Sequence, residues 1–118
     1  MSIRVLVVAL LALSVAPVGA GERIGVRVTP TVAFAPADLQ VRASVPADSD
    51  NRALEVIAES HTFYSSSEIQ LDGETAPTTT TVEFRSVPVG LYSVRVVVKG
   101  TGGKEIASAR TEVNIVGR

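Results

Sequence analysis

Beyond its first twenty residues, this chain alternates between apolar and polar side chains with a period of two. The alternation is clearest in residues 39–45, 80–85 and 107–115. Successive side chains of a β-strand point to opposite faces, so a segment of this kind has one face toward a core and one toward water. Val, Ile and Thr, which suit a pleated surface, dominate these segments. The pattern predicts an all-β domain.

The alternating segments predict about seven strands, at residues 24–29, 38–45, 53–60, 67–71, 78–86, 91–99 and 104–116. Turn-forming residues separate them, among them Asp72-Gly73 and the glycine-rich loop at 100–103. No segment after residue 20 has the 3.6-residue period of an amphipathic helix. Short strands with regularly spaced turns favour two packed antiparallel sheets.

The last two strands allow a specific prediction of register. If the glycine-rich loop closes with Lys99 opposite Lys104, Val96 faces Ala107 and Val97 faces Ile106. A shift by one residue would mix the apolar and polar faces, which disfavours it.

The first twenty residues follow a different pattern. A short start with one positive charge, Arg4, precedes an apolar run of eleven residues at 5–15, and Pro17 and small residues lead up to Ala20. This is the order of a secretory signal peptide. The apolar run is shorter than the roughly 20 residues that a membrane-spanning helix needs. We expect cleavage after Ala20 and a secreted or periplasmic domain at 21–118; an uncleaved anchor or a buried strand is the alternative.

Composition restricts the partners and the stabilising bonds. The chain has no cysteine, so disulfides and thiol-based lipid anchoring are excluded. Without Arg4, ten basic residues stand against twelve acidic ones, a net charge of −2. Neither sign is clustered, so nucleic acid has no basic surface to bind and an anionic membrane has no polybasic segment to attract.

Residues 87–96, VPVGLYSVRV, resemble the corner before strand F of immunoglobulin-like and fibronectin type III domains. In these families a tyrosine at the start of strand F bonds back to the backbone just upstream, and Tyr92 stands at the matching position. Gly90 is expected to supply a turn conformation that a Cβ would resist. The resemblance implies an immunoglobulin-like or fibronectin type III-like sandwich.

The chain departs from antibody domains at two positions of this pattern. Val94 stands where the second cysteine would be, and Leu54 or Val56 takes the place of the buried tryptophan. The resemblance therefore points toward fibronectin-like or bacterial immunoglobulin-like domains. Folds of this kind serve many functions, so the resemblance implies no activity.

Three groups of residues are candidates for chemistry or binding. His61, the only histidine, lies near serines and near Glu59 and Glu68, but no nucleophile elbow or oxyanion-site glycines accompany it. Asp48, Asp50 and Asn51 form an oxygen-rich loop that is a weak calcium candidate without the EF-hand pattern. Ile57, Val97 and Ile106 fall on polar strand faces and are candidates for protein contact, with cover by Arg and Lys stems as the alternative.

Five arginines alternate with core positions and are interpreted as the wet faces of strands: Arg27, Arg42, Arg85, Arg95 and Arg110. No cofactor is predicted. We expect an exported, non-enzymatic module that binds an unknown protein or glycan partner or has a structural role in the cell envelope or extracellular space. A calcium-dependent adhesion module, a small hydrolase and an inhibitor or accessory subunit are the alternatives.

Overall fold

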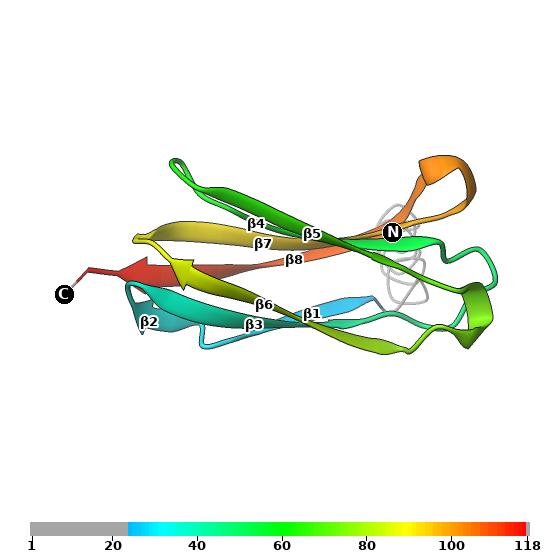
Figure 1. Ribbon diagram of the computed structural model, residues 1–118, viewed down its shortest axis with the longest axis horizontal. Helices are drawn as coiled ribbons and strands as arrows, with labels where there is room; N and C mark the ends of the chain where they lie inside the picture. The colour runs from blue at the N-terminus through cyan, green and yellow to red at the C-terminus, as the bar shows by residue number, and fades with distance from the viewer. Residues whose placement is uncertain (1–23, 118) are drawn as a thin grey trace, which may run out of the picture.

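The computed structural model describes residues 24–117. The predicted signal peptide and its cleavage site lie outside these residues, and both stay predictions. The described chain forms two layers, a three-stranded sheet and a five-stranded sheet (Figure 1). No helix within this range is long and apolar enough to cross a membrane.

Within residues 24–117 the regular elements are eight strands and two single 3₁₀ turns: β1 (Gly25–Thr29), β2 (Val32–Phe34), β3 (Ala37–Ser44), β4 (Ala53–Glu59), β5 (Tyr64–Gln70), η1 (Gly73–Thr75), β6 (Thr79–Val87), β7 (Gly90–Lys99), η2 (Thr101–Gly103) and β8 (Glu105–Val116). The all-β prediction is confirmed, and seven of the strands match predicted ones. The sequence missed β2, because three residues between Pro30 and Pro36 are too few to display an alternation.

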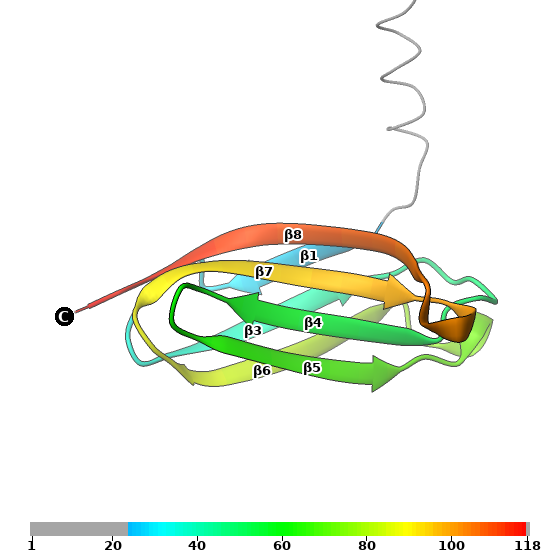
Figure 2. The same cartoon turned by 90° about the horizontal axis from the view of Figure 1, so that it is seen from above.

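The three-stranded sheet has the order β1-β3-β6, and the five-stranded sheet has the order β2-β8-β7-β4-β5. All neighbouring strands are antiparallel except β2 and β8, which are parallel. The expectation of purely antiparallel sheets is therefore wrong at β2. Figure 2 shows that β1 and β8 run in the same direction, and β2 pairs with β8 in parallel, so the chain passes from one sheet to the other between β1 and β2 without reversing direction.

The core lies between the two sheets and is filled by alternate residues of their strands. β3 alternates strictly between buried and exposed positions over its whole length. The largest fully buried side chains include Tyr92, Leu39, Leu54, Val94 and Val96. Each such aliphatic side chain contributes about 1.5–3 kcal/mol on burial, which is the stabilisation that a domain without disulfides depends on.

The register of β7 and β8 differs by two residues from the predicted one. Val96 lies opposite Ala109, not Ala107, and the pairing shifts again between Val98 and Lys99. The Gly100 N–H donates to Lys104 O at 2.7 Å, so the loop closes tightly and Ile106 is left without a partner opposite it. A displacement of two keeps every side chain on its own face, which is why the alternation did not reveal it.

Strand β6 carries a bulge where it leaves β3. Ala37 lies opposite Val87 but Leu39 lies opposite Phe84, so the β6 strand has one extra residue there. Ser86 has a φ of 56°, and its N–H donates to Asp38 Oδ1 at 2.9 Å. A residue in the left-handed region and a local ladder disruption are the marks of a β-bulge.

Candidate functional site

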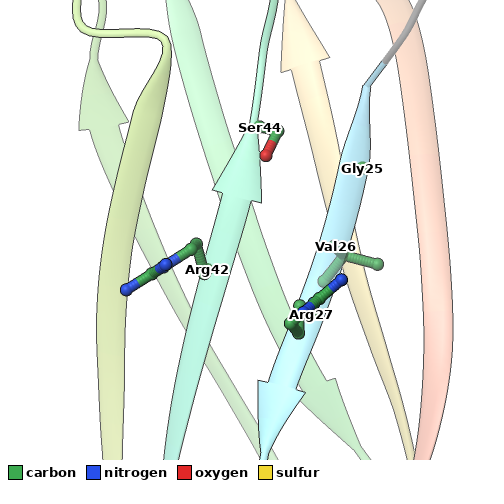
Figure 3. A pocket seen from close by; sticks show the side chains of 5 residues that line it. All are labelled: Gly25, Val26, Arg27, Arg42 and Ser44. Atoms are coloured by element: carbon green, nitrogen blue, oxygen red, sulfur yellow. The ribbon is translucent and has the colours of Figure 1, made fainter.

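Two arginines lie directly opposite each other on the outer face of the three-stranded sheet. Arg27 on β1 pairs with Arg42 on β3, and both side chains are exposed. They line a shallow depression of about 250 Å³ together with Gly25, Val26 and Ser44. Figure 3 shows the Arg42 side chain extending toward β6 while the Arg27 side chain stays over β1. Like charges directly opposite on a sheet are destabilising, so this placement needs compensation.

No acidic side chain within residues 24–117 lies at salt-bridge distance from either arginine. The next positions on this face are occupied by uncharged polar side chains, since Arg42 pairs with Thr81, and Ser44 with Thr79. The nearest acid in the register is Glu83, opposite Gln40, and it forms an ion pair with Arg85 at 3.1 Å. The two guanidinium groups therefore keep donors available for a ligand.

The other cross-strand arginine pair of the structure is surrounded differently. Arg95 lies opposite Arg110 on the outer face of the five-stranded sheet. In the adjacent row, Glu59 and Glu112 flank Ser93 from the two sides. Two carboxylates in the next row reduce the positive potential at this pair, whereas the rows next to Arg27 and Arg42 hold only one, Glu83, which is paired with Arg85.

His61 lies in a tight, exposed turn between β4 and β5. The Ser60 N–H donates to Phe63 O at 2.9 Å and closes this turn. An open hollow of about 300 Å³ brings His61 together with Ser60, Ser93, Glu59, Glu112, Leu91 and Tyr92. Within the described chain, no hydrogen bond joins His61 to a serine or a carboxylate, so the base-to-nucleophile contact of a hydrolase is not formed. Glu68 does not line this hollow.

The oxygen-rich loop after β3 uses its side chains to hold loops together. Asp48 Oδ1 accepts a hydrogen bond from the Asp50 N–H at 2.8 Å, and Asn51 Nδ2 donates to Pro46 O at 2.9 Å. Asp50 Oδ1 accepts bonds from the Thr101 hydroxyl at 2.6 Å and from its N–H at 3.1 Å. The hydrogen bond from the Thr101 hydroxyl lowers the pKa of Asp50 below its ordinary value, and the bond from the Thr101 N–H adds a smaller lowering. A calcium role for this loop stays a prediction.

The three protein-contact candidates do not form one surface. Ile57 and Val97 lie on the outer face of the five-stranded sheet, yet only 3% and 4% of their surfaces are exposed. Ile106, 38% exposed, lies at the loop end beside Val45, Pro46 and Val98. Ser108, not Ile106, is opposite Val97, because of the shifted register. Their contact role stays a prediction.

The corner between β6 and β7 places Tyr92 in the core. Its side chain is fully buried, its hydroxyl donates to Pro88 O at 2.9 Å, and its ring meets Phe63 edge-on at 5.9 Å. This is the upstream backbone bond that the family resemblance implies. Gly90 does not have a positive φ. A Cβ at Gly90 would lie 3.0 Å from Tyr92 Cε1, so close approach of the ring, not a special turn conformation, requires the glycine.

Another apolar cluster lies at the same end, on the outer face of the five-stranded sheet. Val32 and Leu91 both lie beside Asn114, and Phe34 lies beside Val116. Leu91 is 64% exposed and Val32 62%. This cluster does not follow from the sequence, because β2, which contributes two of its residues, is too short to display an alternation.

The arginine pair was also missed, although each arginine was placed correctly on a wet strand face. Alternation along one strand fixes the face of a residue and says nothing about its neighbour on the next strand. The only signal in the sequence was the absence of an acidic residue two positions from either arginine, since 25, 29, 40 and 44 are Gly, Thr, Gln and Ser.

No family model and no curated protein matches this chain. Its fold is similar to that of several solved structures. A superoxide reductase (neelaredoxin) from Ignicoccus hospitalis has 16% identity, with 80% of each chain covered and a TM-score of 0.61. The PKD domain of an M14-like peptidase from a Thermoplasmatales archaeon has 15% identity and a TM-score of 0.53, with 81% of this chain and 99% of that one covered.

A third similar structure is the sporulation control protein Spo0M from Bacillus subtilis. It has 14% identity and a TM-score of 0.54, and the match covers 83% of this chain and 51% of that one. At such identities the likeness extends to the fold alone.

The superoxide reductase overturns the functional prediction made from sequence. The architecture alone predicts a non-enzymatic binding or structural module, but an enzyme of similar length has the same fold. The architecture is thus one that enzymes also use. The error arose because a fold constrains layers and strand order, whereas an activity depends on the site built on them.

The residues of this chain do not fit a transition-metal redox centre, which takes imidazole or thiolate ligands. The chain has one histidine and no cysteine. Across residues 24–117, no three His, Cys, Asp or Glu side chains gather in a way that could hold a metal ion. The reaction named for the similar enzyme is therefore not transferred to this protein.

Proposed function

We propose that this chain is an immunoglobulin-like domain whose three-stranded sheet binds an acidic oligosaccharide through Arg27 and Arg42. The strand orders β1-β3-β6 and β2-β8-β7-β4-β5, the Tyr92 to Pro88 bond and the likeness to a PKD domain support the immunoglobulin-like assignment. The binding surface is defined by its own side chains and is independent of whether the chain also has a catalytic activity.

The single observation that carries the proposal is the opposed arginine pair with no acidic side chain of residues 24–117 at salt-bridge distance. A guanidinium group offers donors in a planar fork that matches the two oxygens of a carboxylate or sulfate. Arg27 and Arg42 line the two sides of one depression. An anion placed there would relieve the repulsion between the two charges and fill donors that no protein carboxylate uses.

The neighbouring side chains favour a sugar as the carrier of the anion. Ser44 lines the depression, and Thr81 and Gln40 lie one position away on the same face. Hydroxyl and amide groups can donate to and accept from sugar hydroxyls. Two arginines on a chain with a net charge of −1 are too few for the phosphate contacts of a nucleic acid.

The proposal is tested by titrating the protein with three probes while recording its backbone amide shifts. The probes are a trisaccharide of uronic acids, a neutral trisaccharide of the same linkage and sodium sulfate. The acidic trisaccharide should shift the amide signals of β1 and β3, and added salt should weaken its binding. Sulfate should bind the same residues more weakly. The neutral trisaccharide should cause no amide shifts at the concentration at which the acidic trisaccharide saturates the protein.

The matched variants are Arg42→Gln and Arg95→Gln, which remove the same charge from the two arginine pairs. Loss of one bidentate, charge-assisted contact should weaken binding about tenfold in Arg42→Gln. Arg95→Gln should bind as the parent does. Equal losses in both variants, equal binding of the neutral sugar, or sulfate binding as tightly as the trisaccharide would each overturn the oligosaccharide proposal.

A further inference from the structure

The two sheets have four edge strands within residues 24–117, and one of them, β5, is long, regular and free of proline and of basic residues, with Glu68 as its one charge. Natural proteins guard free edges with short strands, prolines, charges or bulges. β2 has three residues between two prolines, β1 has five residues including Arg27, and β6 carries the bulge at Ser86 next to a charged pair. β5 has seven residues without proline, lysine or arginine, and it pairs with β4 without a shift.

The alternation of hydrogen-bonded pairs between β4 and β5 identifies which backbone groups of β5 face its free edge. The bonds from Ser60 N–H to Phe63 O and from Leu71 N–H to Arg52 O mark hydrogen-bonded pairs at both ends of the β4–β5 ladder. Such pairs alternate along an antiparallel ladder. The odd-numbered residues of β5 therefore bond to β4, and the even-numbered residues, 64 to 70, direct their N–H and C=O groups to the open edge. Figure 2 shows β5 as the outermost strand of its sheet.

We infer that β5 pairs edge to edge with β5 of a second copy of this chain, antiparallel, around a two-fold axis at Ser67. Ser67 is the middle residue of the strand, so this register uses its full length. It places Tyr64 opposite Gln70 and Ser66 opposite Glu68 of the second copy. These are pairs of even-numbered residues, so the free N–H and C=O groups of both strands meet and bond.

Charge also selects this register. Glu68 is the only charged residue of β5, and in this register it meets a serine. An axis at Glu68 would place two carboxylates directly opposite each other, which is destabilising. An axis at Ser66 avoids that contact but brings fewer even-numbered residues into pairs. A register in which even residues face odd ones would leave the edge groups unbonded.

Single cysteines test the register, because the chain has none of its own. Ser67→Cys places two thiols across the axis in a non-hydrogen-bonded pair, where Cα atoms lie about 4.5 Å apart. That separation lies within the range of disulfides. Ser65→Cys is the matched control, since it faces the same side of β5. Its thiols would be separated by four residues along the strand, about 13 Å.

Under mild oxidation we expect Ser67→Cys to form a covalent dimer at least roughly tenfold faster than Ser65→Cys, because pairing raises the effective concentration of its thiols. Ser66→Pro removes an N–H at the free edge and leaves the bonds to β4 intact. Adding Ser66→Pro to Ser67→Cys should abolish the fast cross-link, and circular dichroism should show an intact fold. Sedimentation of the parent protein should show a concentration-dependent dimer that Ser66→Pro lacks.

Three outcomes would overturn the inference. Equal cross-linking rates for the two cysteine variants would indicate random collision. Fast cross-linking that persists with Ser66→Pro in a folded chain would exclude ladder pairing. A parent protein that sediments as a monomer at every concentration, with no cross-link at position 67, would show that the β5 edge stays open.

Discussion

The two ends of the molecule are held by hydrogen bonds in different surroundings. At the end where β6 turns into β7, the buried Tyr92 hydroxyl donates to Pro88 O at 2.9 Å. At the opposite end, the carboxylate of Asp50 accepts two hydrogen bonds from Thr101, 51 residues away, in a solvent-exposed setting. Tyr92 belongs to the core cluster, whereas Asp50 and Thr101 lie outside it.

The difference shows that a hydrogen bond takes its value from its surroundings. When a buried bond is broken, the abandoned group cannot regain water, and the full desolvation cost appears. When an exposed bond is broken, water replaces the lost partner and salt screens the charge. Changes at the β6–β7 corner should therefore affect global unfolding, whereas changes at the Asp50 loop should have small effects.

The largest effect is expected from truncating Tyr92. Tyr92→Ala removes a fully buried ring and should lower the free energy of unfolding by about 3–5 kcal/mol. Tyr92→Phe keeps the ring and removes only the bond to Pro88, with an expected loss of about 1 kcal/mol. Urea unfolding of both variants measures the two contributions. A Tyr92→Phe variant as stable as the parent would show that the hydroxyl has no role in holding the corner.

An intermediate effect is expected from adding a methyl group at one glycine of each end. A Cβ at Gly90 would lie 3.0 Å from the Tyr92 ring, which the core holds in place. A Cβ at Gly100 would lie 2.6 Å from Asp50 Oδ2 and 2.8 Å from Ile106 Cδ1, which are ends of movable side chains.

Gly90→Ala should therefore cost about 1–3 kcal/mol of stability, as overpacking of a core does. Gly100→Ala should cost less, because Asp50 and Ile106 can move aside. Thermal unfolding of the two variants under identical conditions gives the comparison. A larger loss at Gly100 would mean that the loop end is the more rigid one.

The smallest effect is expected from the charge of Asp50. The hydrogen bonds from Thr101 lower its pKa in the folded state below the ordinary value of 3.8. The resulting stabilisation is present above that value and is lost as the pH falls through the lowered folded pKa. Asp50→Asn keeps an accepting oxygen but has no charge to titrate.

The melting temperature of the parent should exceed that of Asp50→Asn slightly at pH 7, and the gap should close as the pH falls below about 3.8. Added salt should narrow the gap at neutral pH, since the group is exposed. A gap that widens toward low pH would contradict the assigned direction of the pKa shift.

Most of the strand positions followed from local sequence, and the exceptions have physical causes. β3 alternates strictly, so its boundaries and buried face were predictable. β5 was predicted three residues too short at its start, because Tyr64 and the serines that follow it give little apolar contrast. The sequence predicted that Gly90 is needed for its turn conformation, and this was wrong. The glycine is needed because the Tyr92 ring lies against it, and that contact cannot be located from the spacing of the two residues.

The sequence by itself determined which side of each strand meets the core, because side chains alternate with a period of two and water separates apolar from polar ones. It could not determine which strands are neighbours or how they are aligned, since a slip of two residues leaves every face unchanged. The tertiary packing decided those alignments. It placed Arg27 opposite Arg42, left Ile106 unpaired and directed the even-numbered backbone groups of β5 to an open edge.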